Sequence, residues 1–185
     1  AFVDQKSKQV AKAIFGEGVK DKNILGKGVF KQYGKGENGF DVVSNQFSIH
    51  YFFGNKTNLN NFLRNVSECT KVGGYFIGTC YDGNLVFNAL KTKKQNESIM
   101  LKNGDHKLWE IRKEYDHSEF KNDATSLGYS IDVYQETINQ YIREYLVNFD
   151  YLIRCMENFG FVLLSNNDAI KMGLPKGMGN FALLY

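Results

Sequence analysis

The chain has 185 residues, of which 23 are Lys or Arg and 20 are Asp or Glu, so its formal net charge is +3. This length suits one hydrophobic core, and we expect a single domain over residues 1–185. The weak positive charge permits an anionic partner without demanding one, and it is too weak to argue for binding to duplex DNA.

Cysteine usage and hydropathy narrow the class of protein further. The three cysteines are Cys69, Cys80 and Cys155, an odd number without a CxxC pair, which indicates reduced thiols in an intracellular protein. No apolar run is long enough to cross a membrane. No cluster of His, Cys, Asp or Glu has the spacing of a metal site, so we expect no metal.

The N-terminal part of the chain combines a weak helical pattern with a glycine-rich segment. Residues 1–15 place apolar side chains at loosely helical spacing, without a capping residue at the start. Residues 16–39 are rich in Gly and Lys, which predicts a loop. Here Gly34, Gly36 and Gly39 spell GxGxxG. A dinucleotide fingerprint must follow a strand and open a helix, whereas this one precedes a strand, so we expect no phosphate cradle.

The stretch that organises the chain is Phe40–Phe53, FDVVSNQFSIHYFF. Its first part, with Phe40, Val42 and Val43 directly after a glycine, is a short apolar run, which predicts a strand buried in a parallel sheet. The stretch then becomes polar and ends in a loop with one histidine and four aromatic residues. In open α/β sheets, ligands bind outside the carboxyl ends of the strands, so this loop is a candidate ligand site.

A helix and a second strand follow this stretch. Residues 57–71 carry apolar side chains at spacings of three and four, with Thr57 as the expected N-cap and the glycines at 73 and 74 as the stop. Residues 75–79 predict a second buried strand. The resulting βαβ unit should cross over right-handed, which brings the loops after the two strands to one edge of the sheet.

The second half of the chain predicts further elements. Residues 82–107 are polar and predict a helix and a mobile loop, in which KTKK at 91–94 is a solvated face or, alternatively, a phosphate contact. Two segments with alternating apolar residues, 108–115 and 128–134, predict an antiparallel pair inserted after the second strand. The remaining predictions are a helix over 145–159, a strand over 161–165 and a Gly-rich final segment.

Several candidate site residues also have ordinary structural explanations. A lone histidine after a strand, such as His50, is usually a structural or surface residue. The rings of Tyr51 and Phe53 fit plain core positions. At the start of the predicted second helix, Glu144 is explained by the helix macrodipole alone. The residue types by themselves leave these alternatives open.

Three segments together resemble the eukaryotic and large-DNA-virus family of mRNA cap (guanine-N7) methyltransferases. Residues 40–53 match the family's strand and its QFxxHYxF-type sequence. Gly73–Gly83, GGYFIGTCYDG, is similar to the family's GGYFIGTxPD, and Glu144–Phe149, EYLVNF, resembles its EYLV segment. The order and spacing agree over residues 40–165, and the resemblance is closest to the viral branch, where the domain is usually part of a larger capping enzyme.

The resemblance implies a fold, a reaction and a set of site residues. The fold is α/β, a Rossmann-like class I S-adenosylmethionine-dependent methyltransferase with a mostly parallel sheet and an inserted antiparallel strand pair. The reaction is transfer of a methyl group from S-adenosylmethionine to N7 of the mRNA cap guanine. The cap guanine would contact His50, Tyr51, Phe53, Tyr81 and Glu144. The cofactor would lie near Gln46 and Phe47, with Ser48 and Glu17 as weaker candidates.

The chain also departs from the family pattern. The family's first motif, a strand ending in an acidic, Gly-rich loop that cradles the methionine part of the cofactor, does not occur in it. Tyr81 stands where the family often has Pro, and the closing strand pair is incomplete. We therefore expect a partial domain, truncated at the N-terminus and incomplete at the C-terminus, that binds S-adenosylmethionine poorly by itself.

The resemblance also implies partners and a location. The partners would be 5′-capped RNA and other capping-enzyme domains or subunits, without a membrane. The location would be intracellular, in the host cytoplasm or nucleus, or in a virion. Two alternatives remain open: a methyltransferase that acts on another base or a small molecule, and a non-catalytic, degenerate module.

Methylation of guanine N7 makes modest chemical demands on the protein. The N7 lone pair carries no proton, so no general base is required and we expect residues that only position the reactants. Aromatic walls suit the cationic product. A carboxylate at Glu144 would accept hydrogen bonds from the N1 and N2 edge of guanine, which presents donors.

Overall fold

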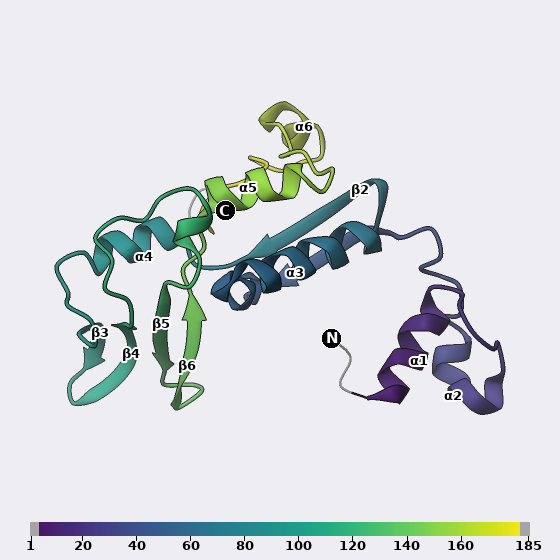
Figure 1. Ribbon diagram of the computed structural model, residues 1–185, viewed down its shortest axis with the longest axis horizontal. Coiled ribbons are helices and arrows are strands. Elements are labelled where there is room, and N and C mark those ends of the chain that lie inside the picture. The colour runs from purple at the N-terminus through teal and green to yellow at the C-terminus, as the bar shows by residue number, and fades with distance from the viewer. Residues whose placement is uncertain (1–3, 182–185) are drawn as a thin grey trace. The chain divides into compact units, whose positions relative to one another are not determined.

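The computed structural model describes residues 4–181 of the chain. Its internal contacts divide these residues into two compact units: unit 1 comprises residues 4–46 and 64–79, and unit 2 comprises residues 47–63 and 80–181. The elements in chain order are α1 (Gln5–Ile14), α2 (Lys22–Phe30), β1 (Phe40–Gln46), the 3-10 helix η1 (Ile49–Gly54), α3 (Lys56–Cys69), β2 (Thr70–Thr79), α4 (Gly83–Ala89), β3 (Ser98–Asn103), β4 (His106–Lys113), the 3-10 turn η2 (Ala124–Ser126), β5 (Ser130–Gln135), β6 (Gln140–Tyr145), α5 (Phe149–Glu157) and α6 (Asn166–Lys171) (Figure 1).

Unit 1 contains the predicted parallel strand pair. Strand β1 pairs with β2 in parallel, from Val42 beside Tyr75 to Gln46 beside Thr79, so the expected strand–helix–strand order is confirmed. Both strands are longer than predicted, and they are not buried: Val42 is 52% exposed and Ile77 50%. The described residues supply no third strand to this sheet, and its apolar face stays open.

The N-terminal helices of unit 1 correct two predictions. Helix α1 does have an N-cap, because the Asp4 carboxylate accepts a hydrogen bond from the Ser7 N–H at 2.8 Å. The Gly- and Lys-rich segment is not all loop: it contains α2, whose cap is Asp21 and which is interrupted at Gly26, where φ is 74°. Glycine content hid this helix, since Gly is a poor helix former.

Helix α3 begins and ends differently from the sequence prediction. Its N-terminus is capped by Asn55, whose side-chain oxygen accepts from the Asn58 N–H at 2.8 Å, whereas Thr57 lies inside the helix. The helix ends at Cys69 and the chain continues directly into β2. The two glycines therefore do not stop the helix. Gly74 lies where β2 passes so close to β1 that a Cβ would come within 2.9 Å of the Phe40 carbonyl oxygen.

Unit 2 is built on an antiparallel sheet in the order β3-β4-β5-β6. The predicted pair is confirmed as β4 and β5, which join in register from Trp109 beside Gln135 to Lys113 beside Ile131. The outer strands β3 and β6 were not predicted. Helix α4, which was predicted, contributes Phe87 and Leu90 to the buried core that also contains Ile131 and Val133 of this sheet.

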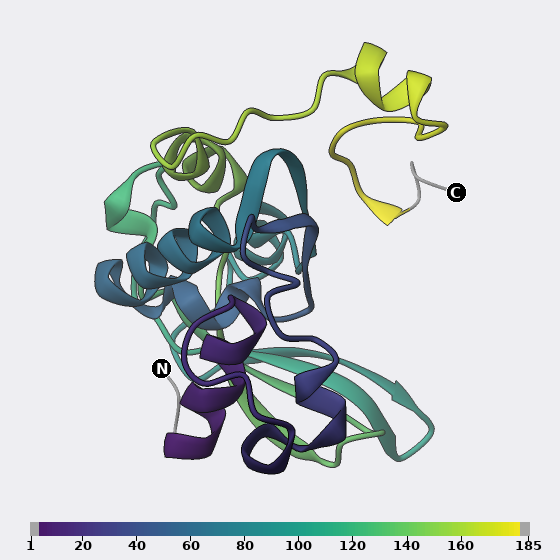
Figure 2. The same ribbon diagram turned by 90° about the vertical axis from the view of Figure 1, so that its right-hand side faces the viewer.

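Two predictions for the C-terminal part of unit 2 are wrong. Glu144 lies in β6, opposite Ile131, and not at a helix start. The following helix, α5, begins only at Phe149, because Asn148 caps it by accepting from the Tyr151 N–H at 3.1 Å. The segment 161–165 forms no strand and runs irregularly between α5 and α6 (Figure 2). Its Val162 is 87% exposed, so the apolar run has no face to bury there.

Residues 4–181 contain neither a membrane-spanning helix nor a metal-binding cluster. None of the helices described there combines the length and the apolar character that crossing a membrane requires. Within the same residues, no group of three or more His, Cys, Asp or Glu side chains is arranged to hold a metal ion. The three cysteines are free thiols, as predicted.

Candidate functional site

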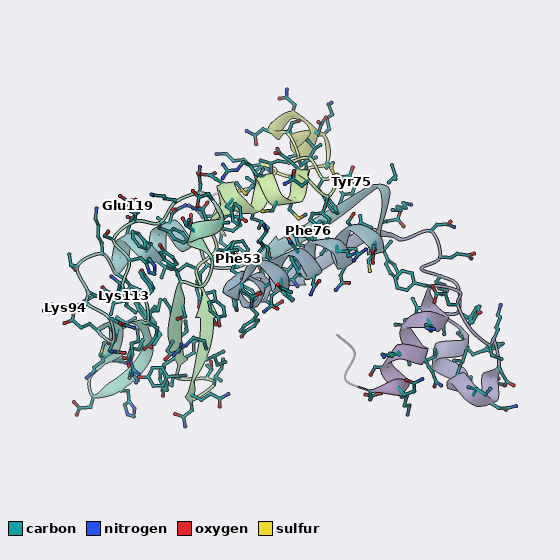
Figure 3. The ribbon with its side chains drawn as sticks, viewed as in Figure 1. Phe53, Tyr75, Phe76, Lys94, Lys113 and Glu119 are labelled. Carbon is teal, nitrogen blue, oxygen red and sulfur yellow. The ribbon has the colours of Figure 1, made fainter. Side chains whose placement is uncertain are left out.

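The 3-10 helix η1 carries three of the predicted site residues. Ile49 and Phe53 are only 2% and 0% exposed, so they anchor this turn within unit 2 (Figure 3). His50 is 4% exposed, whereas Tyr51 is 42% exposed. The two rings meet edge to face with their centroids 4.3 Å apart. The turn therefore holds a buried imidazole directly beside an accessible phenol.

Strand β6 brings Glu144 to the same place. Glu144 is 7% exposed, and its Oε1 lies 3.7 Å from Nε2 of His50. That distance is too long for a hydrogen bond. Within the described residues, Oε2 of Glu144 and both ring nitrogens of His50 are buried without a hydrogen-bond partner. Native proteins rarely leave buried polar atoms unpaired, so this cluster is a candidate for a ligand that supplies the missing partners.

Burial dominates the electrostatics of this cluster. It raises the pKa of Glu144 to about 7 and lowers the pKa of His50. Both shifts favour the neutral forms, so His50 and Glu144 do not form a stable ion pair in the protein alone. Burial also raises the pKa of Tyr51, and the nearby Glu144 charge raises it further. A carboxyl group that titrates near neutrality in a partly open site is a common sign of function.

The segment Cys80–Gly83 reaches the same cluster from a distant part of the chain. Burial raises the pKa of Cys80 to about 12, and the charges of Asp82 and Glu144 add to this effect. Gly83 fixes the segment, because its N–H donates to the Val147 carbonyl at 3.0 Å. A Cβ on Gly83 would lie 2.7 Å from the Val147 nitrogen, so only glycine permits this approach.

Tyr81 lies at the rim of an open cavity on the sheet of unit 2. Its hydroxyl accepts a hydrogen bond from Nε2 of Gln135 at 3.1 Å. The cavity has a volume of about 440 Å³ and is lined by Tyr81, Trp109, Ile111, Val133 and Gln135, among others. This volume lies within the range of small-molecule sites.

The predicted cofactor residues belong to different parts of the chain. Gln46 ends β1 in unit 1, where its Oε1 accepts from the Thr79 hydroxyl at 2.8 Å. Phe47 begins unit 2 with a φ of 49°, an uncommon value for a residue other than glycine. Its ring is 59% exposed and stacks on Phe181 at 6.2 Å. Ser48 precedes η1. Glu17 is exposed in the turn after α1.

Comparison with known proteins gives a match to one family model. A model of the mRNA (guanine-N(7))-methyltransferase domain matches residues 4–173. This chain belongs to the mRNA (guanine-N7) methyltransferase domain family. The predicted family is confirmed, and the mixed α/β fold, with its parallel pair and its antiparallel sheet, is consistent with a class I methyltransferase.

Individual members of the family differ in how much of the chain they match. The probable mRNA-capping enzyme of Acanthamoeba polyphaga mimivirus is 35% identical over 136 residues, which is 70% of this chain and 11% of that protein. The mRNA cap guanine-N(7) methyltransferase of Saccharomyces cerevisiae is 26% identical over 146 residues, 77% of this chain and 33% of the yeast protein. The same enzyme of Aspergillus niger is 45% identical over 51 residues, 28% of this chain and 8% of that protein. The chain thus spans a third or less of each relative.

Within this methyltransferase domain, the structure brings some predicted residues together and adds others. His50, Tyr51 and Glu144 form one cluster. Cys80 and Gly83 were not predicted, because the close approach of Gly83 to Val147 follows from the fold and not from a sequence pattern. Trp109 and Gln135 were also missed, because their positions follow from strand register and not from any motif.

Proposed function

We propose that this chain carries the guanine-binding site of an mRNA cap guanine-N7 methyltransferase. The observation that supports the proposal most is the buried Glu144 carboxyl group. Among residues 4–181, its Oε2 has no hydrogen-bond partner, and neither has either ring nitrogen of the neighbouring His50. Guanine offers two neighbouring donors, at N1 and N2. A carboxylate accepts in two places at once and suits that edge.

The proposed residues act by positioning. Glu144 holds the N1 and N2 edge of guanine, and the exposed Tyr51 ring provides a wall for the base. Aromatic faces attract cations, so the Tyr51 ring also suits the positively charged N7-methylated product. The N7 lone pair needs no base, so a neutral His50 is compatible with the reaction. The protein must still exclude water and align guanine N7 with the methyl group.

The cofactor residues fit S-adenosylmethionine by their chemistry. When bound, this cofactor supplies an activated methyl group. Gln46 offers an amide at the carboxyl end of β1. Phe47 exposes an aromatic ring from a constrained backbone, a feature that clusters at ligand sites. Ser48 adds a hydroxyl, and Glu17 stays a weaker candidate for the adenosine part.

Substitution of Glu144 by Gln tests the proposal. The amide keeps the shape but turns one acceptor into a donor that faces the donor edge of guanine, which costs about 1–3 kcal/mol. In the intact protein we expect a five- to 150-fold loss in cap recognition, since about 1.4 kcal/mol is tenfold. The measurement is methylation of capped and uncapped RNA per folded molecule, with cofactor binding as the control. Unchanged activity on capped RNA would contradict the assignment, and equal methylation of uncapped RNA would indicate another substrate.

A further inference from the structure

The cavity beside Tyr81 is a separate feature of unit 2 from the Glu144 cluster. Its walls include the rings of Tyr81 and Trp109. The side-chain amide of Gln135, from β5, also lines it and donates a hydrogen bond to the Tyr81 hydroxyl. Trp109 is 37% exposed and Tyr81 38%, so both rings are accessible to a ligand. Large aromatic side chains that remain this exposed around a hollow commonly bind planar groups.

Strand register places the cavity and Glu144 on the same face of the sheet. Ile131 of β5 pairs with Glu144, and Gln135 of β5 pairs with Trp109. Residues 131 and 135 are an even number of positions apart, so their side chains point to the same face. Four residues of strand separate the two sites by about 13 Å along β5.

Tyr81 connects the two sites along the chain. Its neighbour Cys80 is close enough to Glu144 for that charge to raise the pKa of the thiol, while the Tyr81 hydroxyl is bonded to Gln135 in the cavity wall. A ligand that starts at Glu144 and spans the distance of about 13 Å between the two sites would reach the cavity. A capped RNA has this form, because its guanosine is linked through three phosphates to the first transcribed nucleotide.

We propose that the cavity lined by Tyr81, Trp109 and Gln135 binds the base of the first transcribed nucleotide, and this inference rests on the proposed function. Trp109 stacks on the base, and the Gln135 amide, which can donate and accept, serves any of the four bases. The site thus recognises that a nucleotide follows the cap without reading its identity.

The first test compares GTP, which has the guanine and the triphosphate, with GpppA, which adds the second nucleoside. In the intact protein, kcat/KM for GpppA should exceed that for GTP, and Trp109→Leu should reduce the ratio about five- to 150-fold, the range for loss of one base–aromatic stack. Trp109→Phe should restore most of the ratio. Met100→Leu, on the opposite face of the same sheet, should leave the ratio as in the wild type. If the ratio in Trp109→Leu is the same as in the wild type, the proposal is wrong.

The second test does not require methylation. Trp109 is the only tryptophan of the 185 residues, so fluorescence excited selectively at tryptophan, and not at the 11 tyrosines, reports on that ring alone. Titration with GpppA should quench it, and titration with GTP should not. If neither compound is methylated, the proposed function fails, and selective quenching by GpppA still supports the cavity assignment. Equal quenching by both compounds, or none by GpppA, overturns it.

Discussion

Burial makes the ionised form of Glu144 unfavourable in the protein alone. Its carboxyl group is 7% exposed, one oxygen has no partner among the described residues, and burial raises its pKa to about 7. A carboxyl group with a raised pKa stabilises the fold fully only below its ordinary pKa of about 4.5, and that stability is lost as the pH rises through 7. Ionisation of Glu144 near and above neutral pH therefore lowers the stability of the fold, a cost that fits the proposed role of this residue in binding.

The pH dependence of stability tests this view of Glu144. The free energy of unfolding of Glu144→Gln, relative to that of the wild type, should rise by about 2–3 kcal/mol from pH 5 to pH 8. The reason is that the amide never ionises, and one pKa unit corresponds to about 1.4 kcal/mol. His50, whose pKa is lowered, destabilises both proteins alike below about pH 6.5 and so cancels in the difference. Denaturant unfolding at the two pH values measures the effect. A variant that is less stable than wild type at pH 8 would indicate a structural His50–Glu144 ion pair instead.

At the scale of elements, Gly83 joins the start of α4 to the segment after β6. A methyl group there would overlap the Val147 backbone, so Gly83→Ala should destabilise the protein by about 1–3 kcal/mol and displace Tyr81. We expect a lower melting temperature and weaker binding of capped RNA. The matched control is Gly28→Ala, where a Cβ meets no atom within 4 Å. Wild-type stability in Gly83→Ala would show that the two segments separate easily.

The outcome for the elements shows what sequence patterns can predict here. The helix α3 and strands β4 and β5 were predictable because their apolar residues follow regular periods. Strand β6 was not, since its inward side chains are Gln140, Ile142 and Glu144, and a carboxyl group at a core position breaks the alternation. The candidate site residue Glu144 is thus the reason that the sequence pattern did not predict β6. The cluster of His50 with Glu144 was predictable only from family resemblance, because the two residues are 94 positions apart in the sequence.

At the scale of the whole molecule, the two units differ in how much apolar surface they bury. The sheet of unit 2 is packed against α4 through a continuous core. The sheet of unit 1 has two strands, and Val42, Tyr75 and Ile77 on one of its faces are 52%, 43% and 50% exposed. Two-stranded sheets are marginal in water. Backbone amides of β1 and β2 should therefore exchange hydrogen faster than those of β4 and β5.

This difference predicts weak binding of S-adenosylmethionine by the 185-residue chain. Gln46 belongs to β1, so a chain in which β1 and β2 are ordered only part of the time binds with an affinity reduced by that fraction. Calorimetry should detect no tight, stoichiometric binding, and added cofactor should leave the fast exchange of β1 and β2 amides nearly unchanged. A second measurement identifies the cause: if β1 and β2 exchange as slowly as β4 and β5 while binding is still weak, order in unit 1 is not limiting. Tight binding together with slowed exchange in β1 and β2 would show that this chain holds its cofactor unaided.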